Sequence, residues 1–301
     1  MTAERVTIAA ARSSWLLACV ADGLRPSTIK TYRSLSGHFV ERFGILDVRG
    51  VPSSSIREFV IARRALVALT SAIDEVVALK VFFGWCSREY ENFRDPMTNI
   101  RRPRAPRLQP RAASFDSVLA LLSTCPNTAL GLRDRAILLT FIDTGIRASE
   151  LLGIKNADFD YSRGRIVVTG KGDKTRVVPV SPFTELAIAR WLVKRPPGAT
   201  HVFCNLGSGV EGQPLLYPGL RQMFRRRSAA AGLSERVTAH QLRHLFSGHY
   251  MDKGGSITRL RDILGHSDIS VTARYARYQI DDLQAGHAER SPVARISGGA
   301  V

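Results

Sequence analysis

Five short stretches in the C-terminal part of the chain carry side chains of the types that perform chemistry. In chain order these candidates are Arg147, Glu150, Lys171, His240, Arg243, His266 and Tyr275. Arg147 follows a predicted helix end, so its guanidinium can point outward, and Glu150 lies three residues on, where it can hold that guanidinium. A guanidinium offers two parallel donors to an oxyanion, so two arginines suit an anionic substrate better than two lysines.

The other stretches add a lysine, two imidazoles and a phenol. Lys171 lies between two glycines in a predicted hairpin turn, on an open loop that can reach into a substrate. His240 and Arg243 share one face of a predicted helix. A predicted helix end leaves the ring of His266 free to face a ligand, and a short helix presents the phenol of Tyr275. Each stretch alone has a commoner structural explanation, such as an exposed turn or a packed tyrosine, so only their combination is informative.

In this order and spacing the five stretches resemble the tyrosine recombinase (phage integrase) family. The family pattern is an arginine with an acidic residue three positions on, a hairpin lysine, H-x-x-R, Gly-His and a tyrosine, and the sequence contains all of them. The resemblance extends over nearly the whole chain, because the family places a helical DNA-binding domain before the catalytic domain. It implies a site-specific DNA recombinase of the Xer-like or transposon-encoded kind, without cofactor or metal.

The resemblance also implies a role for each candidate. Tyr275 would attack a DNA phosphodiester and form a 3′-phosphotyrosine with a free 5′-hydroxyl. His240 would be the general base, and Lys171 would protonate the leaving 5′ oxygen. The residues that would bind phosphate oxygens or orient their neighbours are Arg147, Arg243, His266 and Glu150. Tyr278 is a second candidate nucleophile, but the spacing from Gly-His favours Tyr275.

The charge of the chain indicates a polyanionic partner. The chain has 301 residues and a formal net charge of +17, and basic residues are in excess in both halves. Double-stranded DNA is the first candidate and an anionic membrane surface the second. No long helical pattern combines a cationic face with an apolar stripe, which argues against the membrane surface.

The cysteines and apolar runs exclude several classes of protein. The four cysteines lie far apart in the sequence, which predicts neither a zinc site nor a disulfide framework. No apolar run is long enough to span a bilayer, and the N-terminus lacks the apolar core of a signal peptide. These features predict a cytoplasmic protein.

Apolar residues at helical spacing predict that residues 1–93 form a DNA-binding domain of helices only. Its helices are predicted at 14–21, after Ser27, at 55–66, and from a capping box of Ser71 with Asp74 onward. The aromatic residues of the last helix are interpreted as core and not as a platform for stacked bases.

Residues 94–113 alternate proline with arginine, which predicts an extended basic linker along the DNA. The candidate phosphate contacts in this linker are Arg101, Arg102 and Arg104. Arg225 and Arg226 are further candidates, within a run of three arginines on a predicted helix. Because consecutive helical residues point in different directions, only one or two of the three are expected to contact DNA.

Residues 114–301 are predicted to form a catalytic domain with a C-terminal tail. Its helices are predicted at 114–122, 130–143, 184–194, 220–231, 239–253, 257–264 and 270–276. Strands at 165–169 and 175–180 form an antiparallel hairpin across a glycine-rich turn. The predicted fold class is therefore mainly α with a small antiparallel sheet (α+β). In relatives a terminal helix docks on the neighbouring protomer, so a tetramer on synapsed DNA is expected.

Two other functions would use the same residues. A type IB topoisomerase-like enzyme would nick and close DNA without exchanging partners, and a catalytically inactive accessory protein would only bind it. The separate helical domain and the tail favour a recombinase over the first, and the complete set of catalytic residue types argues against the second.

Overall fold

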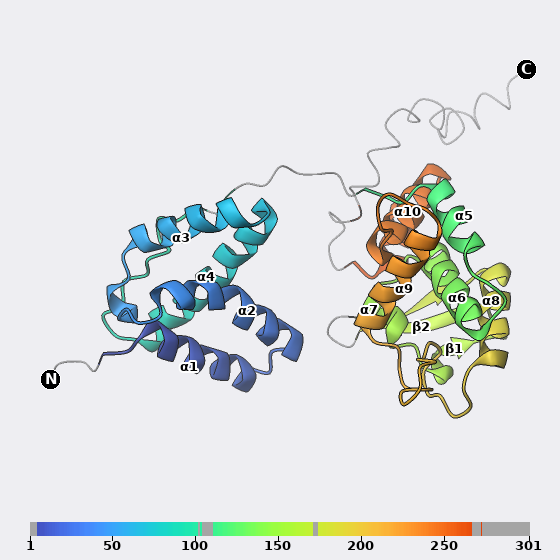
Figure 1. Ribbon diagram of the computed structural model, residues 1–301, viewed down its shortest axis with the longest axis horizontal. Coiled ribbons are helices and arrows are strands. Elements are labelled where there is room, and N and C mark those ends of the chain that lie inside the picture. Colours follow the sequence, from blue (N-terminus) through green and yellow to red (C-terminus); the bar gives the residue numbers. More distant parts are fainter. Residues whose placement is uncertain (1–4, 102, 104–110, 171–173, 267–271, 273–301) are drawn as a thin grey trace, which may run out of the picture. The chain divides into compact units, whose positions relative to one another are not determined.

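The computed structural model describes residues 5–101, 103, 111–170, 174–266 and 272 of the chain. The chain divides into two compact units, Met1–Leu108 and Gln109–Val301 (Figure 1). Helices dominate both units, and the second also contains a three-stranded antiparallel sheet in the order β1-β2-β3. The predicted fold class, mainly α with a small antiparallel sheet, is confirmed.

The first unit is a helical bundle around an aromatic core. Its elements are α1 (Ile8–Ala21), α2 (Pro26–Phe43), the 3-10 turn η1 (Val48–Gly50), α3 (Ser53–Leu66) and α4 (Leu69–Glu89). Trp15, Phe39, Phe82 and Phe83 are all buried in the core. Phe39 and Phe83 meet edge to face with ring centroids 5.8 Å apart, a geometry that aromatic pairs favour. The interpretation of the α4 phenylalanines as core is confirmed.

Besides α3, which begins two residues early at Ser53, three helix starts in this unit differ from their predictions. Helix α1 begins six residues earlier than predicted, after Thr7, whose side chain caps the first turn. Pro26 is the first residue of α2, so Ser27 is already helical and is not a cap. Helix α4 begins at Leu69, so the capping box predicted at Ser71 is wrong. Proline explains the second case, because its fixed φ suits a first helical position and it needs no donor there.

The segment after α4 packs on the first unit. Met97 and Ile100 are buried in its core. The backbone N–H of Met97 donates to the Asp95 carboxylate at 2.8 Å, which closes a turn. Residues up to Ile100 therefore belong to the bundle, although they fall in the predicted linker. Arg101 is exposed, and Arg102 and Arg104 lie outside the described residues.

The second unit places helices around the small sheet. Its helices and turns are α5 (Phe115–Ser123), α6 (Ala129–Thr144), α7 (Ala148–Leu152), η2 (Asn156–Asp158), α8 (Pro182–Lys194), α9 (Tyr217–Ala230), α10 (Ala239–Asp252) and α11 (Ile257–Leu264). Its strands are β1 (Phe159–Asp160), β2 (Arg165–Thr169) and β3 (Thr175–Pro179). The helices of this unit were predicted to within a few residues, except that the helix predicted at 270–276 falls mostly outside the described residues.

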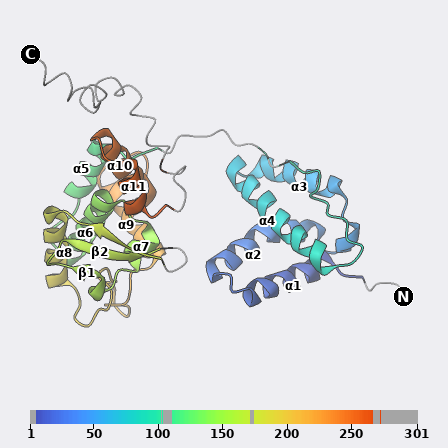
Figure 2. The ribbon, with the colours of Figure 1, turned by 180° about the vertical axis from the view of Figure 1, so that it is seen from behind.

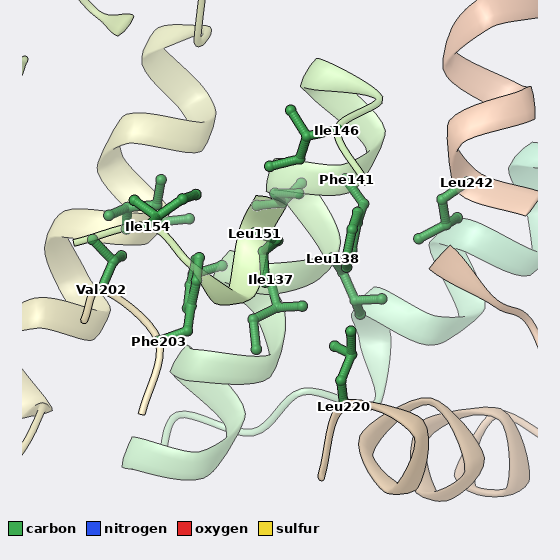
Figure 3. Close-up of a cluster of buried hydrophobic side chains, with 14 of the residues drawn as sticks. Ile137, Leu138, Phe141, Ile146, Leu151, Ile154, Val202, Phe203, Leu220 and Leu242 are labelled. Carbon is green, nitrogen blue, oxygen red and sulfur yellow. The ribbon is translucent and has the colours of Figure 1, made fainter. Parts of the chain in front are cut away.

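Helix α6 is the centre of the second unit. It contacts α7, α8 and α10, and Ile137, Leu138 and Phe141 lie in the cluster of buried side chains that Figure 3 shows. A helix that is apolar on most of its sides is stable only when it is buried in this way. Each of these side chains contributes roughly 1.5–3 kcal/mol relative to an exposed position. The core therefore holds the end of α6 rigidly, and that end begins the candidate site.

The predicted hairpin is confirmed. Strand β2 pairs with β3 from Arg165 opposite Pro179 to Thr169 opposite Thr175. The N–H of Gly170 donates to the carbonyl of Lys174 at 2.8 Å, which holds the two ends of the turn together. Strand β1 was not predicted, because two residues are too few to show an alternating pattern.

Candidate active site

Two glycines end the helices that begin the site. Gly145 ends α6 with φ 60°, and Gly265 ends α11 with φ 63°, as the sequence predicted for both helix ends. This left-handed conformation favours glycine. A Cβ on Gly145 would lie 2.4 Å from the ring of Phe246, so the position is also too crowded for a side chain. Helix α11 contacts α10 and strand β3, and Figure 2 shows it beside α10.

Arg147 and Glu150 form the predicted pair at the start of α7. The Glu150 carboxylate accepts the backbone N–H of Arg147 at 2.7 Å and the Nη1 of the same residue at 2.9 Å. The side chain of Arg147 is 40% exposed, whereas that of Glu150 is 1% exposed. The expectation that Glu150 holds this guanidinium is confirmed, and Arg147 still reaches solvent.

Arg176 on β3 joins this pair, although the sequence analysis did not single it out. Its Nη1 and Nη2 donate to the two oxygens of Glu150 at 2.8 and 2.9 Å, and its Nε donates to the carbonyl of Ile263 at 2.7 Å. The side chain is 14% exposed. Arg176 therefore connects the hairpin strand, the start of α7 and the end of α11.

Arg243 and His266 meet at the same helix end. Arg243 is buried; its Nη1 donates to the carbonyl of Gly145 at 2.6 Å and its Nη2 to that of Leu264 at 2.9 Å. Its Nη2 also lies 2.8 Å from Nε2 of His266. Because a guanidinium can only donate, Nε2 of His266 accepts, and Nδ1 carries the proton toward Thr272 Oγ1 at 2.9 Å. The prediction that the ring of His266 is free to face a ligand is wrong for this structure, because the ring is held between Arg243 and Thr272.

Three arginines donate hydrogen bonds to the C-terminal carbonyls of α11. Ile263, Leu264 and Gly265 offer their oxygens to Arg176, Arg243 and Arg147 respectively, the last at 3.2 Å. The last carbonyls of a helix have no partner within the helix and carry partial negative charge, so they attract cations. The resulting Glu150 cluster consists of Arg147, Glu150, Arg176, Arg243 and His266.

The charge of Glu150 is strongly stabilised. Burial alone would raise the pKa of its carboxyl, but the hydrogen bonds from Arg176 and from Arg147 outweigh burial and lower the pKa to about 2. The carboxylate is therefore ionised at neutral pH. The cluster contains three guanidiniums, two of which bond Glu150, and this one carboxylate, so it has an excess of positive charge that suits an anionic ligand.

His240 lies one turn before Arg243 on α10 and is exposed. Its Nε2 lies 2.9 Å from Nε2 of the buried His244. A hydrogen bond between two imidazole nitrogens needs one proton, so one ring donates and the other accepts. The ring of His244 therefore fixes the position of His240. Leu242, between them in the chain, is buried.

Lys171, Tyr275 and Tyr278 lie outside the described residues. The expectation that Lys171 and Tyr275 complete the site therefore stays a prediction. The described neighbours of Lys171 are Gly170 and Lys174, at the two ends of the hairpin turn.

The run of three arginines on α9 divides as its helical geometry predicted. Arg225 is exposed. Arg226 is 40% exposed at its side chain and donates to Asp134 at 2.6 Å. Arg227 is buried and donates to the same carboxylate at 2.9 Å. Arg133 completes this Asp134 cluster (Arg133, Asp134, Arg226 and Arg227), so only Arg225 and Arg226 remain candidates for a phosphate contact.

The described residues contain neither a membrane-spanning helix nor a metal-binding group. No described helix is both long and apolar enough to cross a membrane. Within the same residues, no three His, Cys, Asp or Glu side chains come together in a way that could hold a metal ion.

Comparison with known proteins gives one consistent result. Residues 112–281 match the phage integrase family. The chain is 33% identical over 245 residues to the tyrosine recombinase XerC of Syntrophus aciditrophicus, covering 77% of each chain. It is 29% identical over 282 residues to the XerC of Xylella fastidiosa (strain 9a5c), covering 92% of this chain and 94% of that one. The fold is similar to that of the Tn1549 transposon integrase in complex with transposon right end DNA, with a TM-score of 0.77 and 17% identity over 95% of this chain and 99% of that one.

Proposed function

The chain belongs to the phage integrase family and is a site-specific DNA recombinase of the tyrosine type, and we propose that Tyr275 is its nucleophile and that the Glu150 cluster binds the phosphate under attack. The observation that supports this proposal most directly is the convergence of Arg147, Arg243 and His266 on the end of α11. These residues come from separate parts of the chain, and two guanidiniums beside an imidazole are the groups that suit an anionic phosphate.

Arg147 and Arg243 hold the non-bridging oxygens of the phosphate. In-line attack increases the negative charge on these oxygens, and fixed guanidiniums stabilise that charge more in the transition state than in the ground state. His266 donates to one of the oxygens. In the structure Nε2 of His266 accepts a hydrogen bond from Arg243. To donate to the phosphate instead, Nε2 must carry the proton, so the proton has to move from Nδ1 to Nε2.

Cleavage and rejoining are two successive steps, and in each of them one P–O bond forms while another breaks. The phenol oxygen of Tyr275 bonds to phosphorus while the bond from phosphorus to the 5′ oxygen breaks. The phenolic proton passes to His240, and Lys171 gives a proton to the leaving oxygen. The product is a 3′-phosphotyrosine and a free 5′-hydroxyl. The 5′-hydroxyl of a second strand then attacks the phosphotyrosine and gives its proton to Lys171, while the bond from phosphorus to Tyr275 breaks and the phenol takes its proton back from His240. The phosphate ester is conserved, so ATP is not needed.

His240 is suited to its role by its neighbour. A base must meet the phenol in one orientation, and the contact with Nε2 of His244 restricts the orientation of the His240 ring. Because His244 is buried and His240 is exposed, the first ring can position the second without contacting substrate.

The partner is double-stranded DNA with a specific crossover site, and the working assembly is a tetramer on two synapsed sites in the cytoplasm. The basic excess of the sequence supports the polyanionic partner. The residues proposed to contact the DNA backbone are Arg101, Arg102, Arg104, Arg225 and Arg226. Such contacts give affinity without reading the sequence.

A nicked-duplex experiment tests the nucleophile and the reaction class together. DNA from the locus that encodes the chain is prepared with a nick next to the candidate crossover, so that the short product diffuses away and the covalent intermediate accumulates. Wild type, Tyr275→Phe and the matched control Tyr278→Phe are incubated with it and run on denaturing gels.

The expected result is a protein–DNA adduct with wild type and with Tyr278→Phe and none with Tyr275→Phe. An adduct that persists in Tyr275→Phe and disappears in Tyr278→Phe would move the nucleophile to Tyr278. Tight binding of locus DNA with no adduct from wild type on any nicked fragment would contradict the proposal and favour an inactive DNA-binding protein.

A further inference from the structure

Arg176 is the less exposed of the two arginines that bond Glu150, and it makes both of its bonds to the carboxylate through its side chain. Both of its terminal nitrogens bond the carboxylate, one to each oxygen. Arg147 contributes one side-chain bond and one backbone bond. Together these four bonds use the acceptor positions that a carboxylate offers. Glu150 is thus fully satisfied, with a cation on each side of it.

The two cations differ in what else they can reach. The Arg176 side chain is 14% exposed and its Nε is bonded to Ile263. A Cβ on Gly265 would lie 2.8 Å from its Nη1, so the backbone of Gly265 closes one side of the guanidinium. The Arg147 side chain is 40% exposed, and its side-chain bonds to Glu150 and Gly265 use two of the five N–H donors of a guanidinium.

In these contacts the positive charge of Arg176 balances the negative charge of Glu150. If Glu150 had only Arg147 as a partner, its negative charge would cancel the positive charge that a phosphate must find there. A second, enclosed cation removes this cancellation, because the pair Glu150–Arg176 is neutral by itself. We propose that Arg176 is a positioning residue that neutralises Glu150 and so keeps the exposed guanidinium of Arg147 available to a DNA phosphate.

The inference rests on the proposed function, since it concerns the same phosphate site. It adds that Arg176, which contacts neither phosphate nor nucleophile in this scheme, controls how strongly Arg147 binds the phosphate. If Arg176 and Glu150 were only a structural ion pair, removing both partners would not restore the rate that is lost when Arg176 alone is removed. Replacement of a buried ion pair by neutral groups of similar volume often costs little stability.

The test is a double-mutant cycle on the rate of adduct formation. Wild type, Arg176→Gln, Arg176→Lys, Glu150→Gln and Glu150→Gln/Arg176→Gln are compared in single turnover with the nicked locus duplex, at saturating protein. Arg133→Gln is the matched control, because Arg133 also bonds a buried carboxylate with two nitrogens and a backbone carbonyl with a third. Thermal unfolding of each variant is followed in parallel.

Arg176→Gln is expected to slow adduct formation by about 10- to 100-fold, because the unneutralised carboxylate draws Arg147 toward it. Arg176→Lys should stay within about 5-fold of wild type, because the proposed role depends on the positive charge and not on the two parallel donors. The double variant should be at least about 10-fold faster than Arg176→Gln, since no carboxylate is left to compete. Arg133→Gln should lower the melting temperature without slowing adduct formation in the folded protein.

A double variant as slow as Arg176→Gln would overturn the inference, and so would an Arg133→Gln rate that falls as far as that of Arg176→Gln. If Arg176→Gln does not fold, a folded double variant that reacts more than about 100-fold slower than Arg176→Lys contradicts it equally. Wild type that forms no adduct is a separate result: it rejects the proposed function, and the inference with it.

Discussion

Two buried carboxylates of the second unit are surrounded by arginines in nearly the same way. Glu150 is bonded by Arg176, 14% exposed, and by Arg147, 40% exposed. Asp134 is bonded by Arg133 and Arg227, each 7% exposed, and by Arg226, 40% exposed. Among the arginines that bond the carboxylate, the Glu150 cluster has one enclosed cation and the Asp134 cluster has two. Each cluster also has one cation that reaches solvent.

The clusters differ in what the arginines contact beyond the carboxylate. In the Glu150 cluster, each of the three arginines bonds a carbonyl at the end of α11, beside His266, and Arg243 also bonds the carbonyl of Gly145. In the Asp134 cluster they go to the carbonyls of Thr124 and Cys204, on separate segments of the chain. The described contacts of the Asp134 cluster include no imidazole. A buried carboxylate with several arginines is thus a structural device in itself, and it becomes a candidate for catalysis only where it orders groups that can exchange protons.

The largest difference between the clusters is expected in the rate of cleavage. Arg243→Lys should slow adduct formation by about 100- to 1000-fold, because lysine cannot supply two fixed donors to the phosphate oxygens. Arg133→Lys makes the same exchange in the Asp134 cluster and should change the rate by less than about 3-fold. Single-turnover rates on the nicked duplex, corrected for the folded fraction, measure both. Equal losses would show that the distinction between the two clusters is wrong.

The second prediction concerns the charge of Glu150 and the dependence of stability on pH. The folded pKa of Glu150 is about 2 against 4.5 for the unperturbed group. A depressed folded pKa stabilises the protein above the unfolded pKa, and that stability is lost as pH falls toward the folded pKa. The loss for Glu150 amounts to at most about 3 kcal/mol between about pH 5 and about pH 2.

Glu150→Gln removes this titration. Its free energy of unfolding should therefore fall less steeply with acid than that of wild type over the same range, although the variant is less stable at neutral pH. Urea unfolding at a series of pH values gives both curves. Parallel curves would mean that the arginines do not hold the charge of Glu150 as the geometry indicates.

The parts of the site that the sequence predicted are those with a local signal. The ends of α6 and α11 were predicted from Gly145 and Gly265, since a glycine after a periodic apolar run marks a helix end. The Arg147–Glu150 pair follows from a separation of three residues. In both cases the partners are neighbours in the chain, so spacing alone contains the geometry.

Arg176 was missed because its partners are distant in the chain. One signal for it was available. On β3, Val178 is buried and Val177 exposed, so residue 176 lies on the inward face by the two-residue period of a strand. A charged residue at an inward position requires a buried partner. The sequence contains that requirement but does not name Glu150, and the same holds for Asp134 and Arg227.

The smallest expected effect concerns the exposed cation of the Asp134 cluster. Arg226 donates to Asp134 through Nη2 and is still 40% exposed, so it can contact a DNA phosphate while Asp134 fixes its position. Arg226→Gln should lower the slope of log Kd against log salt concentration by about 1, with a uniform loss of affinity across DNA sequences. Arg133→Gln is the control: it removes a cation from the same carboxylate at a buried position and should leave the slope unchanged. Titration of a fluorescent duplex of unrelated sequence from low to high salt measures both. An unchanged slope in Arg226→Gln would mean that Asp134 and all of its arginines are purely structural. The Glu150 cluster would then differ from the Asp134 cluster in two ways, since it alone would contact a phosphate and take part in the reaction.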